Sequence, residues 1–208
     1  MAIKPILFNT EMVRAILDGR KTCTRRICKD ANEYTVPDMD FYNADSRTYA
    51  VHNFADQEHT EQLSTAERSC PICPGDILYV RETWHKSPLR YMYRADYSDT
   101  EKFYRDGKEI EMKWHPSLHM PKEAARIWLK VTDVRVERLQ DITSEQIGRE
   151  GVEIEYPYVL NGEEKIYAFS NLWNGTVKKS DIDRYGWDAS PWVWVIEFER
   201  CEKPEGVK

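Results

Sequence analysis

The chain has 208 residues, which lies near the upper end of the range for one domain, so a single elaborated domain is expected. Hydrophobic residues make up 41% and charged residues 32% of the sequence. This composition supplies enough apolar side chains for a core and excludes a disordered chain. The formal net charge of -6 argues against a general nucleic-acid-binding protein, which would carry an excess of Lys and Arg.

The sequence has no apolar run of about 18 residues that would span a bilayer, and its N-terminus lacks the apolar stretch of a signal peptide. We therefore expect a cytoplasmic protein without a membrane partner. Five cysteines, an odd number, favour free thiols or a metal site over a disulfide framework.

The first strong signals in chain order are a strand and a helix near the N-terminus. The pattern predicts a strand over residues 3–8, followed by a helix that begins at Asn9 or Thr10 and ends at Gly19. Residues 1–30 are rich in Lys and Arg, whereas the next stretch is strongly acidic. A local cationic site on an acidic body is typical of a pocket for a small anion or a short strand.

Two segments read as insertions between stronger elements. Residues 30–69 are polar and acidic and predict a long insertion with one short strand at 48–54, and residues 97–113 form a second, charged insertion. The remaining predicted strands are 77–84, 91–95, 125–139 and 192–199, and a second helix is predicted at 141–150. This order of elements predicts an α+β protein built on a small, mostly antiparallel barrel.

The segment from Gly19 to Arg26 resembles the G-[RK]-K-T-x-T-x-R signature of the ASCH domain family, which belongs to the PUA-like superfold. Residues 74–84 are similar to the family's G-D-x-L-x-V strand in its longer, phage-associated form. Residues 114–121 and 191–195 resemble that same longer form. The resemblance implies a PUA-like pseudo-barrel with flanking helices and a cleft, formed by one domain over residues 1–208.

The resemblance also implies an activity and its residues. Small bacterial ASCH members are amidohydrolases on 4-N-acetylcytidine and use a Lys as proton acceptor, a Thr as nucleophile and a Glu as proton donor. The Lys and the Thr fall on Lys21 and Thr24. The Glu falls on Glu150, with Glu145 as the alternative in the same predicted helix.

The residues of the signature segment suit this chemistry. A threonine hydroxyl attacks an amide only when a base takes its proton, and a lysine does so when burial or neighbouring cations depress its pKa. Arg20, Arg25 and Arg26 would supply those cations and could hold a ligand phosphate bidentately. The alternative is that these side chains form ordinary surface ion pairs or partner the preceding helix dipole.

Other residues are candidates for ligand contact. Glu82 lies on a predicted strand, where a pair with Lys21 or an arginine would bury it. In the loop that follows residue 113, Trp114 offers a stacking surface and His115, Ser117 and His119 offer hydrogen-bond donors to a phosphate. The two histidines are equally candidates for metal ligands, and packing or surface roles remain open for both.

The cysteines allow a zinc site. Cys70 and Cys73 have the C-x-x-C spacing of a zinc knuckle, and Cys23 and Cys28 would complete four thiolates. The spacing of the second pair is unusual, and Cys23 lies inside the signature segment. Independent thiols and no cofactor are therefore the expectation.

Three functions are consistent with these residues. The first is a hydrolase that removes an acyl group from a modified cytidine nucleoside. The second is a non-catalytic reader of a modified base or a short RNA, and the third is a metal-dependent ribonuclease. All three share a nucleoside, nucleotide or short RNA as partner.

Overall fold

The computed structural model describes residues 1–29, 31, 35–153 and 163–206, so residue 30 and residues 32–34 of the longer predicted insertion lie outside the described residues. The chain divides into two compact units. Unit 1 consists of Met1–Lys21, Gly75–Lys130 and Glu199–Lys208, and unit 2 consists of Thr22–Pro74 and Val131–Phe198.

Unit 1 contains a small mixed sheet. β1 (Ile3–Leu7) pairs in parallel with β6 (Ile77–Arg81), and β6 pairs antiparallel with the first residues of β11 (Trp128–Arg138). Leu78, Val80 and Leu129 are buried along these strands. The predicted strands at residues 3–8, 77–84 and 125–139 are confirmed, with slightly shorter bounds.

The helix α1 (Thr10–Leu17) of unit 1 begins and ends where its sequence predicts. The side chain of Asn9 accepts a backbone hydrogen bond of 2.8 Å in the first turn. Gly19 has φ 77°, a left-handed conformation, and the N–H of Arg20 donates to the carbonyl of Ala15 at 2.9 Å. This Schellman turn ends the helix and directs the chain into the signature segment.

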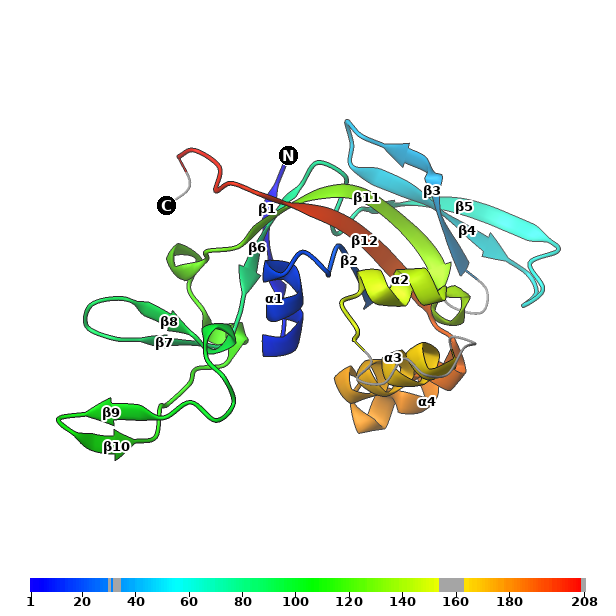
Figure 1. The fold of residues 1–208 in the computed structure, drawn as a ribbon. Helices are drawn as coiled ribbons and strands as arrows, with labels where there is room; N and C mark the ends of the chain where they lie inside the picture. Colours follow the sequence, from blue (N-terminus) through cyan, green and yellow to red (C-terminus); the bar gives the residue numbers. More distant parts are fainter. Residues whose placement is uncertain (30, 32–34, 154–162, 207–208) are drawn as a thin grey trace. The chain divides into compact units, whose positions relative to one another are not determined.

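Two hairpins complete the regular structure of unit 1 (Figure 1). Their strands are β7 (Trp84–Lys86) with β8 (Tyr91–Tyr93), and β9 (Phe103–Arg105) with β10 (Lys108–Ile110). The second hairpin lies in the segment predicted as a charged insertion. Short 3₁₀ helices lie at Arg94–Asp96, Ser117–His119 and Lys122–Ala124 in unit 1, and at Leu139–Asp141, Lys179–Asp181 and Trp187–Ala189 in unit 2.

Unit 2 has a sheet with helices packed on one face. β2 (Cys23–Ile27) pairs antiparallel with β12 (Trp192–Cys201). Val193 and Val195 of β12 pack in one apolar cluster with residues of the helical segments. The helices of unit 2 are α2 (Ser144–Arg149), α3 (Glu163–Thr176) and α4 (Ile182–Tyr185). Because side chains alternate along a strand, the neighbours of these valines face the opposite side of the sheet.

The long predicted insertion is more ordered than its sequence indicates. β4 (Thr48–Phe54) confirms the predicted short strand, and β3 (Thr35–Asn43) and β5 (Gln62–Ser69) flank it in an antiparallel three-stranded sheet. The prediction of a single strand was therefore wrong. Nearly all side chains of β5 are exposed, so its hydrogen bonds to β4 hold it in place without leaving an alternating apolar pattern.

The protein has an α+β fold with mostly antiparallel strands. Within the described ranges the strands form separate open sheets and do not close into a barrel. In the part of the chain that the structure describes, every helix is too short or too polar to cross a membrane.

Candidate functional site

The most deeply buried charge of unit 2 belongs to Arg25 on β2. Its side chain is 1% exposed, and its Nη1 donates to Glu150 Oε1 at 3.2 Å. Its Nη2 donates to Glu137 Oε2 at 3.2 Å and to Gln146 Oε1 at 3.1 Å. One guanidinium thus donates to three side chains: Glu137 of β11, Gln146 of α2, and Glu150, which caps the C-terminus of α2.

One donor of this guanidinium has no acceptor. Arg25 Nε is buried and has no hydrogen-bond partner among the described residues. Buried polar groups in native proteins are nearly always bonded, and an exception calls for an explanation such as a water or a ligand. Arg25 Nε is therefore a buried donor in unit 2 that lacks a hydrogen-bond acceptor among the described residues.

The neighbouring residues on β2 form a second contact. Arg26 Nη1 donates to Thr24 Oγ1 at 2.7 Å and to the carbonyl of Arg25 at 2.9 Å. Burial lowers the pKa of Arg26, and the attraction of Glu150 opposes this shift. In unit 2 the structure therefore joins four residues of the predicted site as two contacting pairs, Thr24 with Arg26 and Arg25 with Glu150.

A row of ion pairs continues across unit 2. Arg135 Nη1 donates to Glu197 Oε1 at 2.6 Å, and Arg149 Nη2 donates to Glu197 Oε2 at 2.5 Å. Burial alone would lower the pKa of Arg135, but its hydrogen bonds to Glu137 and Glu197 raise it. Burial likewise would raise the pKa of Glu197, but the bonds from both arginines lower it. The charges of this row thus largely neutralise one another.

Lys21 and Arg20 belong to unit 1. Lys21 is only 2% exposed, and its Nζ lies 5.5 Å from the centre of the Phe8 ring. Such complete burial is rare for a lysine. Arg20 Nη2 donates to Asp18 at 2.9 Å, an ion pair of the surface kind that was the alternative to ligand binding.

Glu82 in unit 1 pairs with an arginine, one of its two predicted partner types. Arg126 Nε and Nη2 donate to its two carboxylate oxygens at 2.9 and 3.0 Å, and Arg126 Nη1 donates to Asp96 at 2.8 Å. Burial raises the pKa of Glu82, and the bonds from Arg126 oppose this rise. Arg126 could not be identified as the partner from local sequence signals, because the two residues are 44 positions apart.

The predicted loop residues of unit 1 lie in an aromatic region. The ring of His115 lies 5.1 Å from that of Trp84, and Trp114 packs edge-on against other rings. Ser117 and His119 lie in one 3₁₀ turn, with His119 exposed. These contacts make the region a small aromatic core, and its ligand contacts stay a prediction.

The five cysteines are all free thiols. Cys23, Cys28, Cys70 and Cys73 are buried. Over the described ranges, no group of three or more His, Cys, Asp or Glu side chains is placed to hold a metal ion. The C-x-x-C turn instead makes local bonds, with Cys73 Sγ 3.4 Å from the carbonyl of Cys70.

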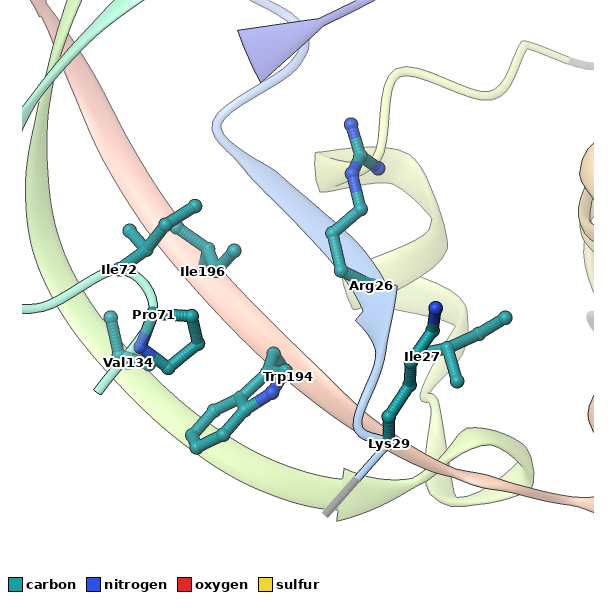
Figure 2. Close-up of a pocket in the computed structure, with 8 residues that line it drawn as sticks. All are labelled: Arg26, Ile27, Lys29, Pro71, Ile72, Val134, Trp194 and Ile196. Carbon is teal, nitrogen blue, oxygen red and sulfur yellow. The ribbon is translucent and has the colours of Figure 1, made fainter. Parts of the chain in front are cut away.

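Unit 2 also contains a pocket of about 260 Å³ that sequence reasoning missed (Figure 2). Eight residues line it: Arg26, Ile27, Lys29, Pro71, Ile72, Val134, Trp194 and Ile196. Trp194 and Ile196 alternate with the valines that face the helices, so they line the opposite face of the sheet. The only sequence signal was this alternation along β12.

Comparison with protein-family models and with curated proteins gives no match. Among solved structures, the chain is similar to the crystal structure of hypothetical protein PH0355, with 16% sequence identity and a TM-score of 0.36. The match covers 97% of this chain and 100% of that chain. At this TM-score the likeness establishes neither the fold family nor the function.

Proposed function

We propose that the chain is an ASCH-type, PUA-like protein that removes an acyl group from a modified cytidine nucleoside. One observation carries the proposal. The hydroxyl of Thr24, a residue that is 1% exposed, accepts a 2.7 Å hydrogen bond from Arg26, and the guanidinium of Arg26 is attracted by the charge of Glu150. The buried hydroxyl of Thr24, the half-buried Arg26, and the buried pair of Arg25 with Glu150 thus lie on one strand and one helix end. Buried groups of this kind are enriched at functional sites.

The proposed reaction assigns one role to each of three residues. Thr24 Oγ attacks the acyl carbonyl and gives its proton to a base, the role that the resemblance assigns to Lys21, and Glu150 gives a proton to the departing exocyclic nitrogen of the cytosine. Water then hydrolyses the acyl-threonine ester and restores the hydroxyl. Because Thr24 Oγ1 accepts its bond from Arg26, its own hydrogen remains available for a base. The role of Lys21 rests on the resemblance alone.

The charge pairing of unit 2 supports a nucleoside over a nucleotide as substrate. Arg25, Arg135 and Arg149 already donate to carboxylates. A phosphate would have to displace these carboxylates, whereas an uncharged nucleoside needs only hydrogen bonds. This pairing argues against the predicted phosphate clamp at Arg25.

The test is incubation of the protein with 4-N-acetylcytidine and with cytidine, read by mass spectrometry. We expect conversion to cytidine and acetate, abolished in Thr24→Val and lowered by about 10² to 10⁴-fold in Glu150→Gln and in Lys21→Met. Thr22→Val is the matched control, because Thr22 lies two positions away and its hydroxyl accepts from Arg149 at 3.3 Å. Conversion that survives in Thr24→Val would contradict the assignment.

A reader of modified bases is the second candidate, and one observation favours it. Glu150 is held by the buried Arg25, an arrangement that also serves a rigid binding site. The same experiment separates the two functions. Retention of intact 4-N-acetylcytidine with no acetate released identifies a reader, and weaker retention in Arg25→Met would then be expected.

A further inference from the structure

The pocket of unit 2 has an apolar body and a cationic side. Figure 2 shows the side chains of Pro71, Ile72 and Val134 on one side and those of Arg26 and Lys29 on the other. The flat indole of Trp194 lies between the two groups. An occupant that matches these walls has an apolar, flat body and one anionic group.

The apolar walls are held in place by their own contacts. The ring of Tyr49 packs edge-on against that of Trp194 with centroids 5.0 Å apart and an interplanar angle of 88°. Cys70 Sγ lies 2.9 Å from the carbonyl of Ile72, and the amide of Cys70 donates to the carbonyl of Arg47 at 2.9 Å. These bonds fix the turn that carries Pro71. A pocket with preformed walls loses little conformational entropy when a ligand enters.

The cationic side is held as firmly. Two hydrogen bonds fix the guanidinium of Arg26, one to Thr24 and one to its own backbone neighbour. The loss of hydration exceeds the attraction of Glu150, and as a result the pKa of Arg26 falls. A second negative charge nearby would offset this desolvation. Lys29 is exposed and can approach an anion from the solvent side.

The pocket volume limits the size of the occupant. A cavity of about 150 Å³ accepts a benzene ring, and drug-sized ligands occupy pockets above about 300 Å³. The volume of about 260 Å³ lies between these limits. It suits one ring or two fused rings and is small for a whole nucleotide.

We propose that this pocket binds a small planar aromatic carboxylate, with its ring against Trp194 and Pro71 and its carboxylate toward Arg26 and Lys29. The pocket shares Arg26 with the proposed hydrolysis, but neither proposal requires the other. Arg26 contacts the Thr24 hydroxyl through its guanidinium and lines the pocket with its side chain. Binding is therefore measured directly and not through turnover.

The probes are 2-naphthoate and its neutral analogue 2-naphthamide, titrated into the full chain by calorimetry. We expect the carboxylate to bind about tenfold more tightly than the amide, because hydrogen bonds from the cationic side chains to a charged acceptor are stronger than those to a neutral one. Lys29→Gln should weaken naphthoate by about threefold to fivefold, as an exposed ion pair allows, and leave naphthamide unchanged. Equal affinity of the two probes, or no binding at millimolar concentration, would overturn the proposal.

A filling variant tests the location. Ile72→Trp places an indole in the pocket and should weaken both probes by roughly tenfold or more. Leu89→Trp is the matched control, because Leu89 is 95% exposed and lies outside the pocket. Lys179→Gln is the matched control for Lys29→Gln. Unchanged binding in Ile72→Trp, with an unfolding curve like that of the parent chain, would place the ligand elsewhere and reject the site.

Discussion

Unit 1 buries Glu82 against Arg126 and unit 2 buries Arg25 against Glu150, and these two ion pairs are built differently. In unit 1 the buried carboxylate of Glu82 receives both of its bonds from Arg126 at 2.9 and 3.0 Å. In unit 2 the buried group is the guanidinium of Arg25, whose bonds to Glu150 and Glu137 are 3.2 Å long. Arg126 also packs over the ring of Tyr93 at 4.0 Å. The first pair is complete, whereas the second divides one cation among several acceptors.

The difference indicates which pair serves structure and which lies at a site. A bidentate pair with a cation–π contact meets every bonding requirement of the buried carboxylate. Arg25 keeps a buried Nε without an acceptor among the described residues. Incomplete satisfaction of a buried group costs stability, and proteins retain it mainly where it has a function. This criterion supports Arg25 as part of the proposed site, whereas ligand contact by Glu82 stays a prediction.

The largest expected effect separates the two pairs by stability. Arg126→Met leaves the Glu82 carboxylate, 1% exposed, without its counter-charge, and should lower the free energy of unfolding by about 3–5 kcal/mol. Arg25→Met should lower it less, because Glu137, 22% exposed, is rehydrated, the buried Glu150 keeps the attraction of Arg26, and the Nε defect disappears. Urea unfolding checks the totals, and hydrogen exchange of β6 and β2 amides assigns each loss to its unit.

Lys130→Met is the control for these variants. Lys130 lies on β11, is 53% exposed and reaches Glu199 only at 3.9 Å, so its loss should change the unfolding free energy by less than about 0.5 kcal/mol. If Arg25→Met costs as much as Arg126→Met, the contrast between a complete and an incomplete pair is wrong.

The pH dependence of the unfolding free energy of Arg126→Met tests the same comparison between the two ion pairs. The pKa of Glu82 is raised above its ordinary value of 4.5, so its contribution to stability is greatest below that pH and falls as the pH rises through the folded pKa. In Arg126→Met the arginine no longer opposes the effect of burial, so the pKa of Glu82 rises further. The penalty of the variant should therefore shrink in acid, by about 1.4 kcal/mol for each unit of that further rise. Unfolding curves between pH 4 and pH 8 measure it, and a constant penalty would contradict the assigned burial.

Local signals were enough to predict several elements. Asn9 and Gly19 set the two ends of α1, and Thr143 with Gln146 predicted the capping box that begins α2. These signals work because a cap and its helix lie within a few residues of each other.

Contacts between distant residues could not be predicted. Glu150 is 125 positions from Arg25, and nothing local to either residue specifies that they meet. β3 and β5 were missed because their stability comes from pairing with β4; nearly all side chains of β5 stay in solvent, and those of β3 are mostly only partly buried. The pocket was missed for a related reason, since Pro71 and Trp194 come from segments far apart in the chain.

The last comparison concerns Gln146, which takes part both in a local helix cap and in a contact with a residue distant in sequence. Its Oε1 accepts the Thr143 amide at 2.9 Å, as a capping box requires, and also accepts Arg25 Nη2 at 3.1 Å. Gln146→Ala should therefore lower the free energy of unfolding by about 2 kcal/mol, because it removes a cap and an acceptor of a buried charge. Asn9→Ala in unit 1 removes a cap alone and should cost about 1 kcal/mol.

Thermal or urea unfolding of both variants measures this difference, and the double variant Gln146→Ala with Arg25→Met identifies its source. If Gln146 contributes through Arg25, the two losses in unit 2 should sum to more than the loss of the double variant. Strict additivity would mean that Gln146 acts only as a helix cap. The 3.1 Å contact would then contribute nothing to holding Arg25, and Glu137 and Glu150 would be its effective partners.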